Sequence, residues 1–133
     1  MAIVKPIAKS VYVCHEVTFD PQSGKLSLLN IWDTIRVPQG AGFPYRLAKI
    51  CVFAWLRDGF GKIDVRVVIV EASSEKLIRK TKAYTLEFPD RTVSIYANYR
   101  IDGCNFPAPG DYYVELYCED EFVDDQVIRV LAS

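Results

Sequence analysis

The sequence is poor in the residue types that most catalytic and metal sites use. It has one histidine and four cysteines in 133 residues, and none of them has the close spacing of a zinc-binding motif. The adjacent Cys14 and His15 do not make a site either, because neighbouring residues of a strand point to opposite faces. We therefore expect no catalytic residue, no metal ion and no cofactor, and we expect that the protein is not an enzyme.

Long apolar runs are also missing. The longest stretches, residues 50–56 and 26–32, are far shorter than the about 20 residues that a membrane-spanning helix needs. Near the N-terminus, Lys5, Pro6 and Lys9 interrupt the stretch in which a secretory signal needs an unbroken apolar segment. The sequence thus predicts a cytoplasmic protein with no membrane partner.

Neither sign of charge dominates the chain as a whole. The 16 basic and 17 acidic residues give a formal net charge of −1, so the broad positive field that holds most proteins on nucleic acid is missing. Half of the residues are hydrophobic, which is enough for a core in a chain of this length. We expect one globular domain over residues 1–133 and no nucleic-acid partner.

The cysteines Cys14, Cys51, Cys104 and Cys118 are too sparse for a secreted disulfide scaffold. In a cytoplasmic protein they stay reduced, and a free cysteine packs as a small apolar residue. We therefore predict four buried free thiols.

Apolar and polar residues alternate with a period of two in most of the chain, and no window longer than about two turns keeps helical spacing. Turn-forming residues separate the alternating segments. This pattern predicts an antiparallel, immunoglobulin-like β-sandwich of seven or eight strands, with a small closed β-barrel as the alternative. The expected strands cover residues 11–19, 25–37, 47–56, 63–69, 77–88, 93–101 and 112–119, with a last strand after a turn at Asp120 and Glu121.

Three of these segments have informative faces. Residues 47–56 are apolar on both faces, which is typical of a central strand covered on both sides. Residues 77–88 are polar, and the lysines there favour an edge strand. His15 shares a face with the valines at positions 11, 13 and 17, which predicts a half-buried ring.

Six segments spread over most of the chain support a comparison: residues 12–14, 23–28, 31–35, 43–44, 50–54 and 106–117. In these segments the chain resembles a bacterial family of about 130 residues whose function is unknown. Within the last of these, the pattern Pro-Gly-x-Tyr-x-Val-x-Leu at residues 109–116 also resembles the penultimate strand of immunoglobulin-like modules. The resemblance supports the β-sandwich and implies no activity and no site residue.

Tyrosines out of phase with the apolar set of their strands point to binding. Tyr96, Tyr113 and Tyr117 fall on faces that the alternation leaves outside, where tyrosine offers contact area with a polar tip. We therefore expect a non-enzymatic interaction module that binds a protein partner or a second copy of itself. The alternative is a small-molecule site lined by aromatics near the loop at residues 38–44.

Charge is unevenly distributed along the chain. Residues 101–133 hold eight acidic residues against Arg129, whereas residues 76–82 hold four basic residues and no acid. The two groups either bind an oppositely charged surface or neutralise each other within the fold, and the acidic turn offers a weaker hypothesis of divalent-cation binding. The candidate residues are Arg79, Lys80 and Lys82 on the basic side and Asp120, Glu121, Asp124 and Asp125 on the acidic side.

Overall fold

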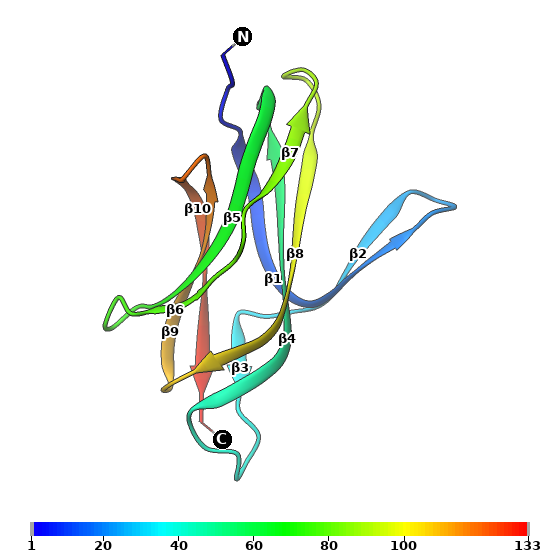
Figure 1. Cartoon of the computed structure of the whole chain (residues 1–133). Coiled ribbons are helices and arrows are strands. Elements are labelled where there is room, and N and C mark those ends of the chain that lie inside the picture. The colour runs from blue at the N-terminus through cyan, green and yellow to red at the C-terminus, as the bar shows by residue number, and fades with distance from the viewer. Residues whose placement is uncertain (1, 133) are drawn as a thin grey trace.

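Ten β-strands are present in residues 2–132, the part of the chain that the computed structural model describes (Figure 1). No helix within those residues could span a membrane. The strands are β1 (Ile7–Asp20), β2 (Lys25–Ile31), β3 (Thr34–Arg36), β4 (Tyr45–Arg57), β5 (Gly61–Glu71), β6 (Leu77–Lys80), β7 (Tyr84–Phe88), β8 (Ile95–Phe106), β9 (Gly110–Cys118) and β10 (Glu121–Leu131).

The strands form two sheets. One has the order β2-β1-β4-β8 and the other β3-β10-β9-β5-β6, with β7 also paired to β5. All pairs are antiparallel except β3 with β10, which is parallel. The predicted all-β sandwich is confirmed, and over residues 2–132 neither sheet closes into the alternative barrel.

The expected strand at residues 25–37 is two strands in different sheets. The chain leaves the first sheet at Trp32, whose N–H donates to the Val13 carbonyl at 2.8 Å, and joins the second at Asp33, whose carbonyl accepts from Arg129 N–H at 2.9 Å. A positive φ of 55° at Asn30 marks the bend. Alternation continues through such a crossing because both ends are extended, so the sequence pattern shows one strand.

The expected edge strand at residues 77–88 is also interrupted. Both β6 and β7 pair with β5, and Thr81 between them bonds to Val67 through its backbone N–H and its hydroxyl, both at 3.0 Å. The predicted position at a sheet edge is confirmed for β6. These two divisions explain why ten strands appear where seven or eight were expected.

The core lies between the sheets and consists of the inward residues of the alternating strands. Burial of each branched aliphatic side chain contributes about 1.5–3 kcal/mol. Two buried tyrosines keep their hydroxyls paired: Tyr99 bonds to the Val65 and Lys82 carbonyls, and Tyr112 bonds to the backbone of Ala108. Fully buried members include Val13, Ile50, Leu56, Ile63, Val65, Ile69, Phe106, Tyr112, Val114, Ile128 and Val130.

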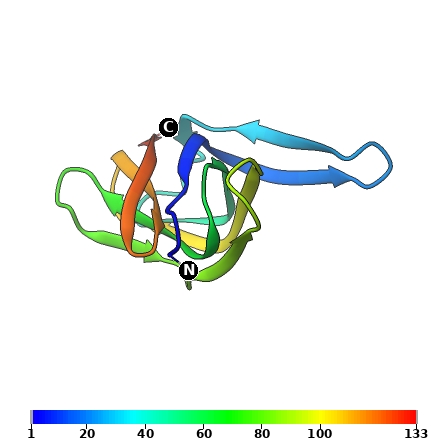
Figure 2. The ribbon, with the colours of Figure 1, turned by 90° about the horizontal axis from the view of Figure 1, so that it is seen from above.

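β1 is longer than the sandwich that it belongs to. Its first half, to Cys14, pairs with β4, whereas residues beyond Cys14 pair only with β2. Residues 15–31 therefore form a two-stranded projection, called the arm below, that stands away from the rest of the molecule (Figures 1 and 2). At its tip the Asp20 carboxylate accepts hydrogen bonds from Gln22 N–H at 2.9 Å and from the Ser23 hydroxyl at 2.8 Å.

His15 is exposed, so the expectation of a half-buried ring is wrong. The alternation continues past Cys14, but there β1 has left the sandwich and no second sheet covers it. The ring instead lies edge-on to Trp32, with a centroid distance of 5.9 Å.

Candidate binding groove

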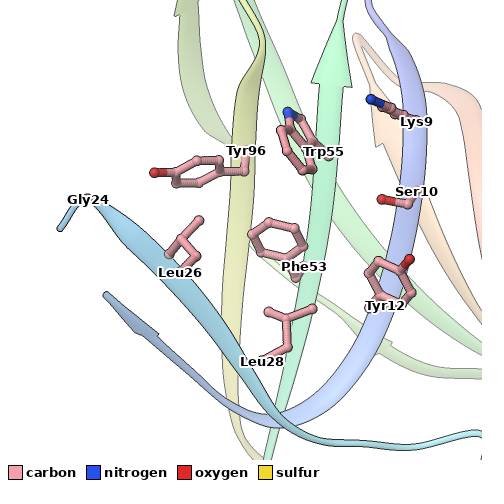
Figure 3. Close-up of a pocket in the computed structure, with 9 residues that line it drawn as sticks. All are labelled: Lys9, Ser10, Tyr12, Gly24, Leu26, Leu28, Phe53, Trp55 and Tyr96. Atoms are coloured by element: carbon pink, nitrogen blue, oxygen red, sulfur yellow. The ribbon is translucent and has the colours of Figure 1, made fainter. Parts of the chain in front are cut away.

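A groove of about 610 Å³ lies between the arm and the outer face of β4 and β8 (Figure 3). Figure 3 shows two leucines of β2 on one side of this space and three aromatic side chains of β4 and β8 facing them. The lining residues are Lys9, Ser10 and Tyr12 of β1, Gly24 at the tip of the arm, Leu26 and Leu28 of β2, Phe53 and Trp55 of β4, and Tyr96 of β8.

Strand register gathers the aromatic residues. Tyr12 lies opposite Phe53 in the β1–β4 pair, and Trp55 lies opposite Tyr96 in the β4–β8 pair. Opposite residues of an antiparallel pair point to the same face with their Cβ atoms about 4.5–5.5 Å apart. The Phe53 and Tyr96 rings contact each other diagonally, at 5.7 Å between centroids.

A β-bulge brings a positive charge to this surface. The register of β1 against β4 shifts between Ala8 and Ser10, which leaves Lys9 as the extra residue. Its Nζ atom lies 5.2 Å from the centroid of the Trp55 ring, within the range of a cation–π interaction. Lys9 is the one charged residue in the lining, so the groove is apolar with a single cation beside it.

Exposure divides the aromatic residues into a floor and a rim. Phe53 is 5% exposed and forms part of the floor, whereas Tyr12, Trp55 and Tyr96 are 40–42% exposed. Large apolar side chains that gather on a surface mark binding sites more often than scattered ones do. The nine lining residues include no carboxylate, imidazole or thiol, so the arrangement suits recognition by contact.

A second hollow of about 330 Å³ continues the groove along the arm. It shares Leu26 and Tyr96 with the groove and extends to Val17, Phe19 and Asn98. Together the two hollows form an elongated apolar track.

The three tyrosines predicted from the sequence lie on different surfaces. Tyr96 lines the groove, but Tyr113 and Tyr117 belong to β9, in the opposite sheet. Tyr113 is 38% exposed, and half-buried Tyr117 packs edge-on to Phe122 at 6.1 Å. The tyrosines thus do not form one shared patch.

Some of the predicted charged residues meet within the molecule. Arg66 Nη1 lies 3.0 Å from Asp120 Oδ1, and Lys80 and Asp120 line the same hollow. Glu121 forms an ion pair with Lys5, whose ammonium group lowers the pKa of that carboxyl. Arg79 donates to the Gly103 carbonyl at 3.2 Å. Arg66 and Lys5, the cations that pair with Asp120 and Glu121, lie outside the predicted basic group.

The acidic hairpin turn lies one residue earlier than expected. Glu119 and Asp120 occupy it with φ values of 53° and 60°, and Glu121 already pairs with Cys118. Asp124 and Asp125 follow in β10, where they are half-buried. Within residues 2–132 no three acidic, histidine or cysteine side chains come together as a metal site.

All four cysteines are buried and free, as predicted. Burial raises the pKa of Cys14, Cys104 and Cys118 to about 11 and also raises that of Cys51. Since the thiolate is the reactive form, these thiols are poor nucleophiles.

The sequence carried one signal for the groove. Residues 47–56 are apolar on both faces, a pattern that predicts a strand covered on both sides, but Trp55 on the outer face is 42% exposed. The expected aromatic cavity at residues 38–44 is instead a hollow with one aromatic residue, Phe43. Because periodicity shows only that a face is apolar, it could not show which apolar face lacks a cover.

Comparison with known proteins gives a family and similarity to solved structures. The model of DUF6941, a family of unknown function, matches residues 9–131. No relative was found among curated proteins. A solved structure of the alkylpurine DNA glycosylase AlkC of Pseudomonas fluorescens, bound to DNA with an abasic site analog, is similar with a TM-score of 0.49 and 13% identity. The match covers 90% of this chain and 30% of the glycosylase chain.

Proposed function

The chain belongs to DUF6941, a family of unknown function, and from the groove we propose that it is a non-catalytic binding module. Its ligand is an apolar, unfolded segment of a partner protein, held between the arm and the outer face of β4 and β8. The observation that carries this proposal is the gathering of Tyr12, Trp55 and Tyr96, each 40–42% exposed, around one groove. Aromatic side chains of this kind supply much of the binding energy at protein interfaces.

The shape of the lining favours an extended segment. The groove and its neighbouring hollow share Leu26 and Tyr96, so an occupant in both lies along the arm. Lys9 beside Trp55 offers a cation for an acidic residue or a carboxyl terminus of that segment. This single charge gives no basic track for a nucleic-acid backbone.

The experiment is a selection of unstructured peptides followed by a fluorescence measurement. Random peptides displayed on phage are selected against the protein, and the enriched sequences are expected to be rich in aliphatic and aromatic residues. Binding is measured in a Trp32→Phe background, where Trp55 is the remaining tryptophan. Burial of Trp55 by the peptide is expected to shift its emission to shorter wavelength.

Matched variants locate the binding site. The double variant Trp55→Ser/Tyr96→Ser, tested by titration calorimetry, is expected to weaken peptide binding by at least about tenfold, because the two anchor aromatics together contribute about 1.4 kcal/mol or more. Tyr113→Ser removes a tyrosine of similar exposure from the opposite sheet and is expected to leave binding unchanged. Equal binding by the two variants would exclude the groove, and enrichment of small polar sequences would contradict the apolar ligand.

We further propose that the sandwich has immunoglobulin-like strand order. Its support is that β1, β4 and β8 form one sheet while β5, β9 and β10 form the other, as strands A, B, E and C, F, G do in that fold. The Tyr112 hydroxyl bonds to the backbone of Ala108, four residues upstream, like the tyrosine corner of those domains. An experimental structure with β8 paired to β9 would contradict this order.

A further inference from the structure

The basic residues in and around β6 form no ion pair within the fold. Residues 76–82 hold four cations and no acidic residue, and none of the ion pairs in residues 2–132 includes any of these cations. Like charges that lie together without a counter-charge repel each other, so a surface of this kind attracts anionic ligands. The proposed function makes no use of this group.

Gly103 of β8 brings one of these cations close to a cation from the other sheet. Arg79 of β6 donates from Nη1 to the Gly103 carbonyl at 3.2 Å. The guanidinium group of Arg46, from β4, occupies the place that a side chain at position 103 would take, because a Cβ atom added there would overlap it. Two guanidinium groups, one from each sheet, therefore lie against one buried glycine.

The backbone at Gly103 makes room for this arrangement. Its φ is +75°, a conformation that glycine adopts readily and other residues adopt at a cost. A larger residue at this position would push the Arg46 guanidinium group away from the β8 backbone. The chain thus holds Arg46 and Arg79 together through a glycine and not through a carboxylate between them.

The two guanidinium groups keep most of their hydrogen-bond donors unused. A guanidinium group carries five N–H donors; Arg79 uses one of them, and the Arg46 side chain forms no hydrogen bond or ion pair with the part of the chain that the structure describes. The neighbouring carboxylate, Asp102, pairs with Arg100 at 3.0 Å. Because a guanidinium group binds oxyanions through two parallel hydrogen bonds, this pair suits a doubly charged oxyanion.

A small hollow of about 190 Å³ adjoins the two arginines. Asn105 lines it and lies opposite Arg46 in the β4–β8 pair, and Ile78, the residue before Arg79, lines it as well. The hollow is mostly apolar and contains one more cation. Its other lining residues are Pro44, Lys76, Leu77 and Pro107.

We propose that Arg46 and Arg79 bind a phosphate monoester, with the small organic group of the ester in this hollow. A phosphate monoester carries about −1.5 to −2 charges at neutral pH and three acceptor oxygens, which matches two guanidinium groups and the nearby Lys76. A carboxylate or a phosphodiester carries a single charge and matches them less well. The site shares no lining residue with the groove, so this inference goes beyond the proposed function and does not depend on it.

The first test is a ¹H–¹⁵N NMR titration of the full chain in phosphate-free, low-salt buffer, with the Gly103 amide as the local signal. Methyl phosphate is expected to shift this signal saturably, and dimethyl phosphate to bind at least about tenfold more weakly because it has one charge fewer. Phenyl phosphate is expected to bind more tightly than methyl phosphate because its ring fills the hollow. Tighter binding of a phosphotyrosine peptide than of phenyl phosphate would assign a phosphorylated side chain as the source of the ester, and equal binding a free ester.

The second test uses variants matched in charge. Arg46→Gln and Arg79→Gln are each expected to weaken methyl phosphate binding by at least about tenfold. Arg91→Gln removes the same charge from an exposed position between β7 and β8 and is expected to leave binding within about twofold. Gly103→Ala keeps every charge but displaces Arg46, so it is expected to weaken binding about as much as Arg46→Gln, with no further loss in the double variant. Spectral dispersion shows whether each variant is folded.

Several outcomes would overturn the proposal. A wild type without saturable shifts up to about 20 mM methyl phosphate excludes the site, and equal binding of dimethyl phosphate excludes selection of the doubly charged group. Equal losses in Arg91→Gln and Arg79→Gln would assign binding to the general field of the protein. Phenyl phosphate that binds no more tightly than methyl phosphate excludes the hollow, and a folded Gly103→Ala variant with unchanged binding excludes the placement of Arg46.

Discussion

The hydroxyl of Tyr112 offers a sharp test of how the second sheet is held together. The ring is fully buried and packs edge-on to Phe106, with 4.9 Å between centroids. The hydroxyl donates to the carbonyl of Ala108 and lies 3.3 Å from its N–H. The hydroxyl also lies 3.4 Å from Glu71 Oε2 of β5. Tyr112→Phe keeps the ring and removes these bonds, so its effect reports how β9 is held to the loop that follows β8 and to β5.

The expected loss of stability follows from the groups left unpaired. A buried polar group without a partner costs about 1–3 kcal/mol, and half-buried Ala108 keeps some access to water, which favours the lower half of that range. We expect Tyr112→Phe to lower the free energy of unfolding by about 1–1.5 kcal/mol. In a chain of this size, that corresponds to a melting temperature lower by about 3–6 °C.

Urea denaturation followed by circular dichroism measures this difference. Tyr113→Phe is the matched control, because Tyr113 is the next residue and is 38% exposed; it is expected to stay within about 0.5 kcal/mol of the wild type. Equal stability of the two variants would refute a structural role for the Tyr112 hydroxyl. A changed denaturant slope would instead show that the variant alters more than one contact.

Three further predictions concern thiols, carboxylates and a glycine. In native protein the four thiols are expected to react slowly with Ellman's reagent at neutral pH, because burial raises their pKa values. In denaturant all four thiols are expected to react, and fewer reactive thiols would indicate a disulfide. Hydrogen bonds lower the pKa values of the Asp20 and Asp90 carboxyls in the folded protein. The contribution of these carboxylates to stability is therefore present above about pH 4 and is lost as the pH falls through the lowered values. In thermal melts, Asp20→Asn and Asp90→Asn are expected to lose less stability on acidification than the wild type, and an unchanged loss would contradict this. Gly103→Ala is expected to lower stability by about 1–2 kcal/mol because φ is +75° there, and an Arg46→Ala/Gly103→Ala variant that regains wild-type stability in urea would assign the effect to the Arg46 side chain instead.

Local pattern was enough to determine the fold class, most strand positions and the state of the cysteines. Inward residues such as Val65, Val114 and Ile128 are fully buried, in phase with their strands. This works because successive side chains of a strand point to opposite faces, so burial on one face leaves a period of two in the sequence.

Only the tertiary structure determined what packs over each of the alternating faces. Residues before and after Cys14 alternate in the same way, yet those before it face the core and those after it form the arm. The groove likewise combines side chains of β1, β2, β4 and β8, which no segment contains together. Periodicity records that a face is apolar, but whether another sheet, the arm or solvent lies over it depends on strand length and pairing across the whole chain, and these are set by contacts between residues distant in sequence.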